Sequence, residues 1–153
     1  MRFKKGLEVG IVVFAVLILD RITKYWAMNF LNEPRIFIPN ILQWRYCKNT
    51  GVAFSALSDT GVLVIWLSAI MLALLAVYLL RKPQISKVVQ FCLWAVLAGG
   101  LSNLYDRIRW GFVVDFIELL FVNFAVFNIA DCFITVGATL AACLLFFRKE
   151  DAQ

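Results

Sequence analysis

The sequence contains no histidine. Histidine is the general base of Ser–His and Cys–His catalysis, so these mechanisms are excluded. It is also a principal zinc ligand, and its absence argues against a metal centre of that kind. Any acid–base chemistry must therefore come from aspartate, glutamate, lysine, tyrosine or cysteine.

Charged residues are scarce as well, at 16% of the 153 residues, whereas hydrophobic residues make up 63%. An ordinary soluble domain is roughly 45–50% apolar, and a fold of this size could not bury the excess. We therefore predict an integral membrane protein with a single membrane domain over residues 1–153. The net charge of +5 comes without a run of five basic residues, so we expect no nucleic-acid partner.

The four cysteines do not form a C-x-x-C motif. Three of them, Cys92, Cys132 and Cys143, lie inside apolar runs, where cysteine behaves as a small hydrophobic residue. A disulfide framework and a thiol redox function are both disfavoured.

Four apolar runs predict a mainly α-helical bundle with spans at about 8–29, 61–80, 88–105 and 129–147. A spanning helix needs about 20 residues. The strictly apolar part of the first run is only Leu7–Leu19, so residues 20–24 must lie near one membrane face. This run is followed by no A-x-A cleavage site and by three further apolar runs, so we interpret it as an uncleaved span.

Four spans place both termini on one side of the membrane. The short flanks and the tight loop 81–87 contain eight basic residues, and the segments 30–60 and 106–128 with the adjoining helix ends contain seven. The positive-inside rule is most reliable for short loops, so we predict cytoplasmic termini and extracytoplasmic segments at 30–60 and 106–128.

The two outer segments differ from plain loops. Residues 33–57 alternate in polarity, with Leu42, Trp44 and Tyr46 on one face, which predicts a small β-sheet on the membrane surface. Residues 109–128 are rich in phenylalanine, which is typical of an interfacial aromatic belt or half-helix.

Polar residues gather at the outer ends of the predicted spans, and each has an ordinary structural explanation. Asp20 and Lys24 can form an i,i+4 ion pair, Gly99 and Gly100 permit close helix packing, and Asp131 suits a helix N-terminus. Together they are costly, because a charge at mid-bilayer costs about 2.5–3.5 kcal/mol on insertion scales. Their concentration at one membrane face favours a functional site.

Without histidine, two facing carboxyl groups are the simplest catalytic unit. One stays ionised and takes a proton from water, while the other remains protonated and donates to the substrate carbonyl. Asp115 and Asp131 are the best candidates, with Asn128 and Asn103 as groups that orient them. Arg107 could pair with a carboxylate or hold a loop. Two alternatives rank lower: Glu118 as one member of the pair, and a Ser–Lys arrangement of Lys24 with Ser55 or Ser58.

Five ordered motifs resemble the signature blocks of bacterial lipoprotein signal peptidase, also called signal peptidase II. They are "DRITK" (20–24), "NTGVAFS" (49–55), "GGLSNLYDR" (99–107), "VVDF" (113–116) and "FNIAD" (127–131). The resemblance implies an aspartic endopeptidase of the bacterial cytoplasmic membrane, with its active site at the outer face. Its substrates would be diacylglyceryl-modified prolipoproteins, cut before the lipid-modified cysteine.

The resemblance also implies the roles of individual residues. It assigns catalysis to Asp115 and Asp131, without a metal or other cofactor and without an acyl-enzyme. The supporting or substrate-binding residues would be Asp20, Lys24, Asn49, Gly99, Asn103, Arg107, Asn128 and Ala130. Besides its substrates we expect membrane lipid as a partner, and a monomer.

Two functions of other classes compete with this interpretation. A small proton-coupled transporter subunit would need polar residues through the full depth of its spans, whereas the second and third runs are nearly apolar. A non-enzymatic lipid-binding scaffold would not require paired acids.

Overall fold

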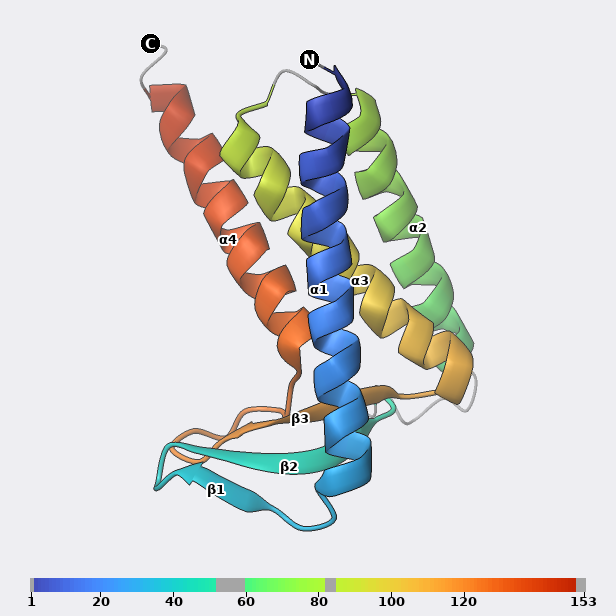
Figure 1. Cartoon of the computed structure of the whole chain (residues 1–153), viewed down its shortest axis with the longest axis vertical. Helices are drawn as coiled ribbons and strands as arrows, with labels where there is room; N and C mark the ends of the chain where they lie inside the picture. Colours follow the sequence, from blue (N-terminus) through green and yellow to red (C-terminus); the bar gives the residue numbers. More distant parts are fainter. Residues whose placement is uncertain (1, 52–59, 82–84, 151–153) are drawn as a thin grey trace.

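The computed structural model describes residues 2–51, 60–81 and 85–150. Four helices follow the long axis of the molecule, and three strands cross it at one end (Figure 1). The helices are α1 (Arg2–Phe30), α2 (Thr60–Arg81), α3 (Lys87–Trp110) and α4 (Ile129–Glu150), and the strands are β1 (Arg35–Ile38), β2 (Leu42–Asn49) and β3 (Val113–Leu119).

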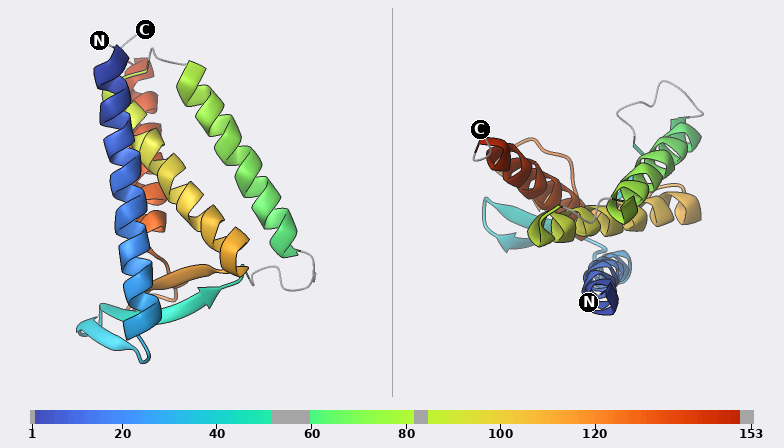
Figure 2. Two further views of the ribbon diagram at one scale, coloured as in Figure 1. Left: turned by 45° about the vertical axis from the view of Figure 1, so that its right-hand side comes forward. Right: turned by 90° about the horizontal axis from the view of Figure 1, so that it is seen from above.

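Helix α3 is the centre of the bundle. It contacts all three other helices, with α1 on one side and with α2 and α4 splayed apart on the other (Figure 2). Two glycines permit these close approaches. A Cβ on Gly99 would lie 2.7 Å from the carbonyl oxygen of Ala130 in α4, and one on Gly100 would collide with Leu72 of α2. The predicted packing role of Gly99 and Gly100 is thus confirmed.

Three helices are long and apolar enough to cross a membrane, as judged by length and composition within the described residues. These segments are Gly61–Arg81, Lys87–Trp110 and Ile129–Phe147. Helix α1 has 29 residues, but three charged side chains, Asp20, Arg21 and Lys24, interrupt its second half. The first of the four expected spans therefore stays a prediction.

The predicted small sheet is confirmed as an antiparallel sheet of order β1-β2-β3. Leu42, Trp44 and Tyr46 pack on a core cluster that includes Ala27 of α1 and Phe116 of β3, as their alternation indicated. The register places Cys47 opposite Asp115. The sheet thereby brings the C-terminal end of β2 to a predicted catalytic residue.

The half-helix interpretation of residues 109–128 is wrong for residues 113–119. Helix α3 continues to Trp110 and ends at Gly111, whose φ of 77° suits glycine and whose N–H bonds to the carbonyl of Arg107. The chain then forms β3, because pairing with β2 satisfies its backbone. The sequence placed the end of the third span at residue 105, but α3 continues to Trp110. Asp106 is buried inside the helix bundle and does not mark the end of the helix.

Candidate functional site

A buried cluster of four charges joins α1 to α3. The ammonium of Lys24 lies 2.9 Å from Asp20 and 2.8 Å from Asp106, and Arg21 lies 2.6 Å from the other oxygen of Asp106. Asp20, Lys24 and Asp106 are at most 1% exposed. Two cations thus balance two carboxylates, which is the condition for keeping such charges out of water. The predicted Asp20–Lys24 pair is confirmed, in the interior of the bundle.

Carboxylate oxygens of this cluster also accept backbone hydrogen bonds from the two elements that carry Asp115 and Asp131. Asp20 accepts a hydrogen bond from the backbone N–H of Ala130 at 2.9 Å, in the first turn of α4. Asp106 accepts one from the N–H of Val114 at 3.3 Å, next to Asp115 in β3. The charge cluster therefore anchors the start of α4, which carries Asp131, and the start of β3, which carries Asp115.

Lys24 also sets the orientation of an amide that reaches Asp131. Its ammonium donates to Oδ1 of Asn103 at 2.7 Å, and Nδ2 of Asn103 donates to Asp131 at 2.7 Å. An ammonium can only donate, so the oxygen of Asn103 must face Lys24 and its nitrogen must face Asp131. Asn103 is thus a positioning residue for that carboxylate.

Asn128 and Asp131 form a reciprocal capping box at the start of α4. The N–H of Asp131 donates to Oδ1 of Asn128 at 2.9 Å, and the N–H of Asn128 donates to Asp131 at 3.1 Å. This geometry leaves Nδ2 of Asn128 free to donate to Asp115 at 2.6 Å. The helix-terminus explanation of Asp131 is confirmed, and the same cap links it to Asp115.

Asp115 is fully buried between two amides. Besides Asn128 it accepts a hydrogen bond from Nδ2 of Asn49 at 2.8 Å. Burial raises the pKa of Asp115 to about 6; the two amide hydrogen bonds lower this pKa, while the negative charge of Asp131 raises it. Asp115 therefore changes protonation state close to neutral pH, as a catalytic acid or base must.

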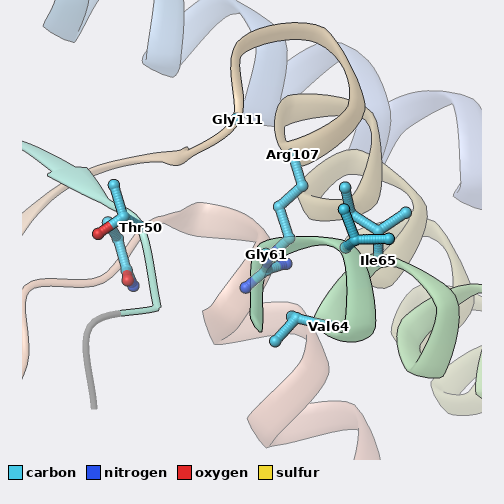
Figure 3. A pocket seen from close by; sticks show the side chains of 8 residues that line it. Thr50, Gly61, Val64, Ile65, Arg107 and Gly111 are labelled. Carbon is cyan, nitrogen blue, oxygen red and sulfur yellow. The ribbon is translucent and has the colours of Figure 1, made fainter. Parts of the chain in front are cut away.

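Of four cavities in this region, Asp131 lines two and Asp115 lines none. Asp131 lines a groove of about 570 Å³ between α2, α3 and α4 and a second cavity of about 540 Å³ between α4 and residues 119–127. Both are walled mainly by aliphatic and aromatic side chains. Asn49 and Arg107 both line a cavity of about 700 Å³ whose lining includes several charged side chains. They also line a small one of about 210 Å³, where Arg107 extends towards Gly61 of α2 (Figure 3).

Most of the predicted supporting residues meet in one network, but Arg107 differs. Its guanidinium contacts the carbonyl of Asn103 at 3.5 Å, and it forms no ion pair within residues 2–51, 60–81 and 85–150. Of the two roles considered for Arg107, pairing with a carboxylate is not seen in this part of the chain, and holding a loop stays a prediction. Glu118 instead forms a salt bridge with Arg45, away from Asp131. Ser55 and Ser58 lie outside the described residues.

The sequence interpretation missed three members of the network: Asp106, Arg21 and Ser102. Asp106 was expected to lie at a span end, and the hydroxyl of Ser102 donates to Asp20 at 2.6 Å. The available signal was charge balance, because a buried Asp20–Lys24 pair beside Arg21 calls for a second carboxylate. In the described part of the chain no three acidic or cysteine side chains are grouped so that they could hold a metal ion.

Comparison with known proteins assigns the family. The family model described as signal peptidase (SPase) II matches residues 12–147. The chain belongs to the signal peptidase II family. Two lipoprotein signal peptidases of Streptococcus pyogenes, from serotype M5 (strain Manfredo) and serotype M3 (strain ATCC BAA-595 / MGAS315), are each 35% identical to it over 97% of both chains.

Solved structures show the same fold. Two structures described as bacterial membrane enzymes superpose with TM-scores of 0.84 and 0.85, at 29% and 27% identity. The match to the first structure covers 90% of this chain and 92% of the other chain. The match to the second covers 95% of this chain and 92% of the other chain. Membership of the signal peptidase II family makes the chain an aspartic-type peptidase that cleaves signal peptides, rather than a transporter subunit or a scaffold.

Proposed function

We propose that the chain removes signal peptides from diacylglyceryl-modified prolipoproteins, cutting before the lipid-modified cysteine, with Asp115 and Asp131 as its catalytic pair. One observation carries this proposal. Asn128 donates to Asp115 through its side chain and binds Asp131 through its backbone, so a single residue holds both carboxyl groups. This shared partner supports the proposal that both acids act on one peptide bond.

In the proposed reaction the two carboxyl groups share one proton. The ionised one accepts a proton from a water molecule as that water attacks the scissile carbonyl carbon. The protonated one donates its proton to the carbonyl oxygen. As the tetrahedral intermediate collapses, it accepts that proton back, while the other carboxyl group passes the proton that it took from water to the leaving nitrogen, so the C–N bond breaks and the pair returns to its starting state. Neither carboxylate bonds to the substrate, so no acyl-enzyme forms. The pair titrates as a unit, with macroscopic pKa values.

The membrane arrangement that we propose includes α1 as a fourth span, with cytoplasmic termini and the site at the outer face. The charges of α1 support this, because Asp20 and Lys24 turn inwards and leave an exposed surface that includes Ile11, Phe14 and Ile22. Such a surface suits lipid. The whole chain would then be a single membrane domain that acts as a monomer.

The groove between α2, α3 and α4 suits the apolar parts of such a substrate. Leu72, Leu93 and Val96 line its walls, and Asp131 with Asn103 lines its polar end. An apolar signal peptide or acyl chain could remain in contact with lipid there while the peptide bond reaches the acids. Membrane lipid is therefore the expected partner of this surface.

The function is tested by incubating the purified protein with a diacylglyceryl-modified prolipoprotein and with the same protein lacking the lipid. Mass spectrometry should show release of the signal peptide only from the modified substrate, with the new N-terminus at the lipid-modified cysteine. The cyclic peptide globomycin, an inhibitor of this family, should block the release. Cleavage at another site, or equal cleavage of the unmodified substrate, contradicts the proposal.

The raised pKa of Asp115 predicts the pH dependence. If one member of the pair must be protonated, kcat/KM should decline above about pH 6, because this parameter reports the free enzyme. The hydrogen bond from Asn49 stabilises the carboxylate and lowers this pKa, so Asn49→Ala should move the decline to higher pH. The measurement is the pH profile of kcat/KM for both proteins.

Gln43→Ala is the matched control for this prediction. Gln43 is also an amide of β2, but it donates to Glu118 and should leave the profile in place. A decline that stays fixed in Asn49→Ala, or moves to lower pH, means that Asp115 does not set it.

A further inference from the structure

The cavity of about 700 Å³ lies between the sheet, residues 123–126 and the nearby ends of α2 and α3, and the proposed reaction leaves it without a role. It extends over Arg45 and Cys47 of β2, Glu118 of β3 and Asn123 of the following segment. The cavities beside Asp131 have mainly apolar walls, whereas charged side chains and amides line much of this one. It therefore suits a polar, water-exposed ligand.

Two residues connect this cavity to the catalytic pair. Asn49 lines it and donates to Asp115. Arg107 lines both this cavity and the apolar groove that ends at Asp131. An extended peptide that leaves the groove beside Asp131 and passes Arg107 would therefore enter this cavity next.

The cavity has an excess of positive charge. Arg45, Lys48 and Arg107 line it with a single carboxylate, Glu118, which Arg45 occupies through two hydrogen bonds of 2.6 and 2.7 Å. Lys48 is exposed and lies 5.2 Å from the ring centroid of Phe112. Neither Lys48 nor Arg107 forms a salt bridge with any residue that the structure describes.

We propose that this cavity binds the first residues of the mature lipoprotein, just after the cleavage site, and that it favours acidic side chains there. The inference rests on the proposed function. A substrate cut at the outer face has an apolar signal peptide on one side of the scissile bond and a polar, water-soluble chain on the other. Of the four cavities, this one matches the polar chain in its charged lining and in its contact with Asn49, the partner of Asp115.

The test uses three diacylglyceryl-modified prolipopeptides that are identical except for the two positions after the modified cysteine. These are Asp-Asp, Ser-Ser or Lys-Lys. The full-length enzyme cleaves them in direct competition, in zwitterionic detergent without anionic lipid. We expect kcat/KM to be about fivefold higher for Asp-Asp than for Lys-Lys, the size typical of partly exposed charges, and we expect this ratio to shrink as salt is added.

Variants then locate the preference. Lys48→Glu should abolish or reverse the ratio, and Glu118→Gln should increase it, because Arg45 is then released from its carboxylate. Arg35→Glu is the matched control. Arg35 is an exposed cation of β1 in the same sheet, but it does not line the cavity. The Asp-Asp to Lys-Lys ratio of this variant should therefore equal that of the wild-type enzyme.

The outcomes separate this inference from the function on which it rests. Normal cleavage of the Ser-Ser peptide with equal rates for Asp-Asp and Lys-Lys overturns only the inference. An equal change in the Asp-Asp to Lys-Lys ratio of kcat/KM in Lys48→Glu and Arg35→Glu does the same. Failure to cleave any of the three peptides overturns the proposed function and the inference together.

Discussion

Asp115→Asn and Asp131→Asn should each lower the rate of prolipoprotein cleavage by roughly a thousandfold or more, the size expected when an acid or base and its partner act as a unit. Asparagine keeps the shape of the side chain but cannot exchange a proton. Each variant therefore leaves one carboxyl group that can no longer share a proton with its neighbour. Single-turnover cleavage of a lipid-modified prolipoprotein measures the effect.

Both variants should remain folded, which makes their loss of activity interpretable. Asp115→Asn turns an NH₂ group towards one of the two amide donors and so loses one hydrogen bond. Because the pKa of this buried carboxyl group is already raised, neutralising it removes a desolvation cost that offsets this loss. In Asp131→Asn the new amide oxygen would still accept the hydrogen bond that caps α4. Glu33→Gln serves as the control. Glu33 is an exposed carboxyl group at the same end of the molecule, and its variant should cleave normally. Near-normal cleavage by either aspartate variant would remove that residue from the catalytic pair.

Lys24→Met should strongly destabilise the protein, by about 3–5 kcal/mol, the range for breaking a buried ion pair. Methionine fills a similar volume but leaves Asp20 and Asp106 buried with Arg21 as their only cation. It also removes the donor that orients Asn103. Thermal or denaturant unfolding in detergent should therefore show a large loss of stability, together with weaker cleavage by the folded fraction.

Arg45→Met provides the contrast, because the Arg45–Glu118 pair is partly exposed, at 42% and 19% of the two side chains. Water already solvates these charges, so loss of this ion pair should lower the free energy of unfolding by at most about 1 kcal/mol. Adding Asp20→Asn to Lys24→Met should recover part of the stability, since one uncompensated charge is removed. A Lys24→Met protein as stable as Arg45→Met would show that the buried cluster contributes little.

The helices were predictable because hydropathy is a local property. The long apolar runs indicated α2, α3 and α4, and the alternation of Leu42, Trp44 and Tyr46 indicated β2. Strand β3 was missed for the opposite reason. Its seven residues resemble an interfacial aromatic segment until β2 lies beside them, and strand pairing is a long-range contact that local composition does not report.

The candidate site divides in the same way. The sequence alone determined the membrane class, the exclusion of histidine chemistry, and Asp115 and Asp131 as the acids to consider, because these depend on residue type and motif. The tertiary structure decided that Asp106 and Arg21 complete the buried charge cluster and that Lys24 orients Asn103. It also decided that Asn128 links Asp115 to the cap of α4. These are distances between residues far apart in the chain, and only the packing of α1, α3, β3 and α4 sets them.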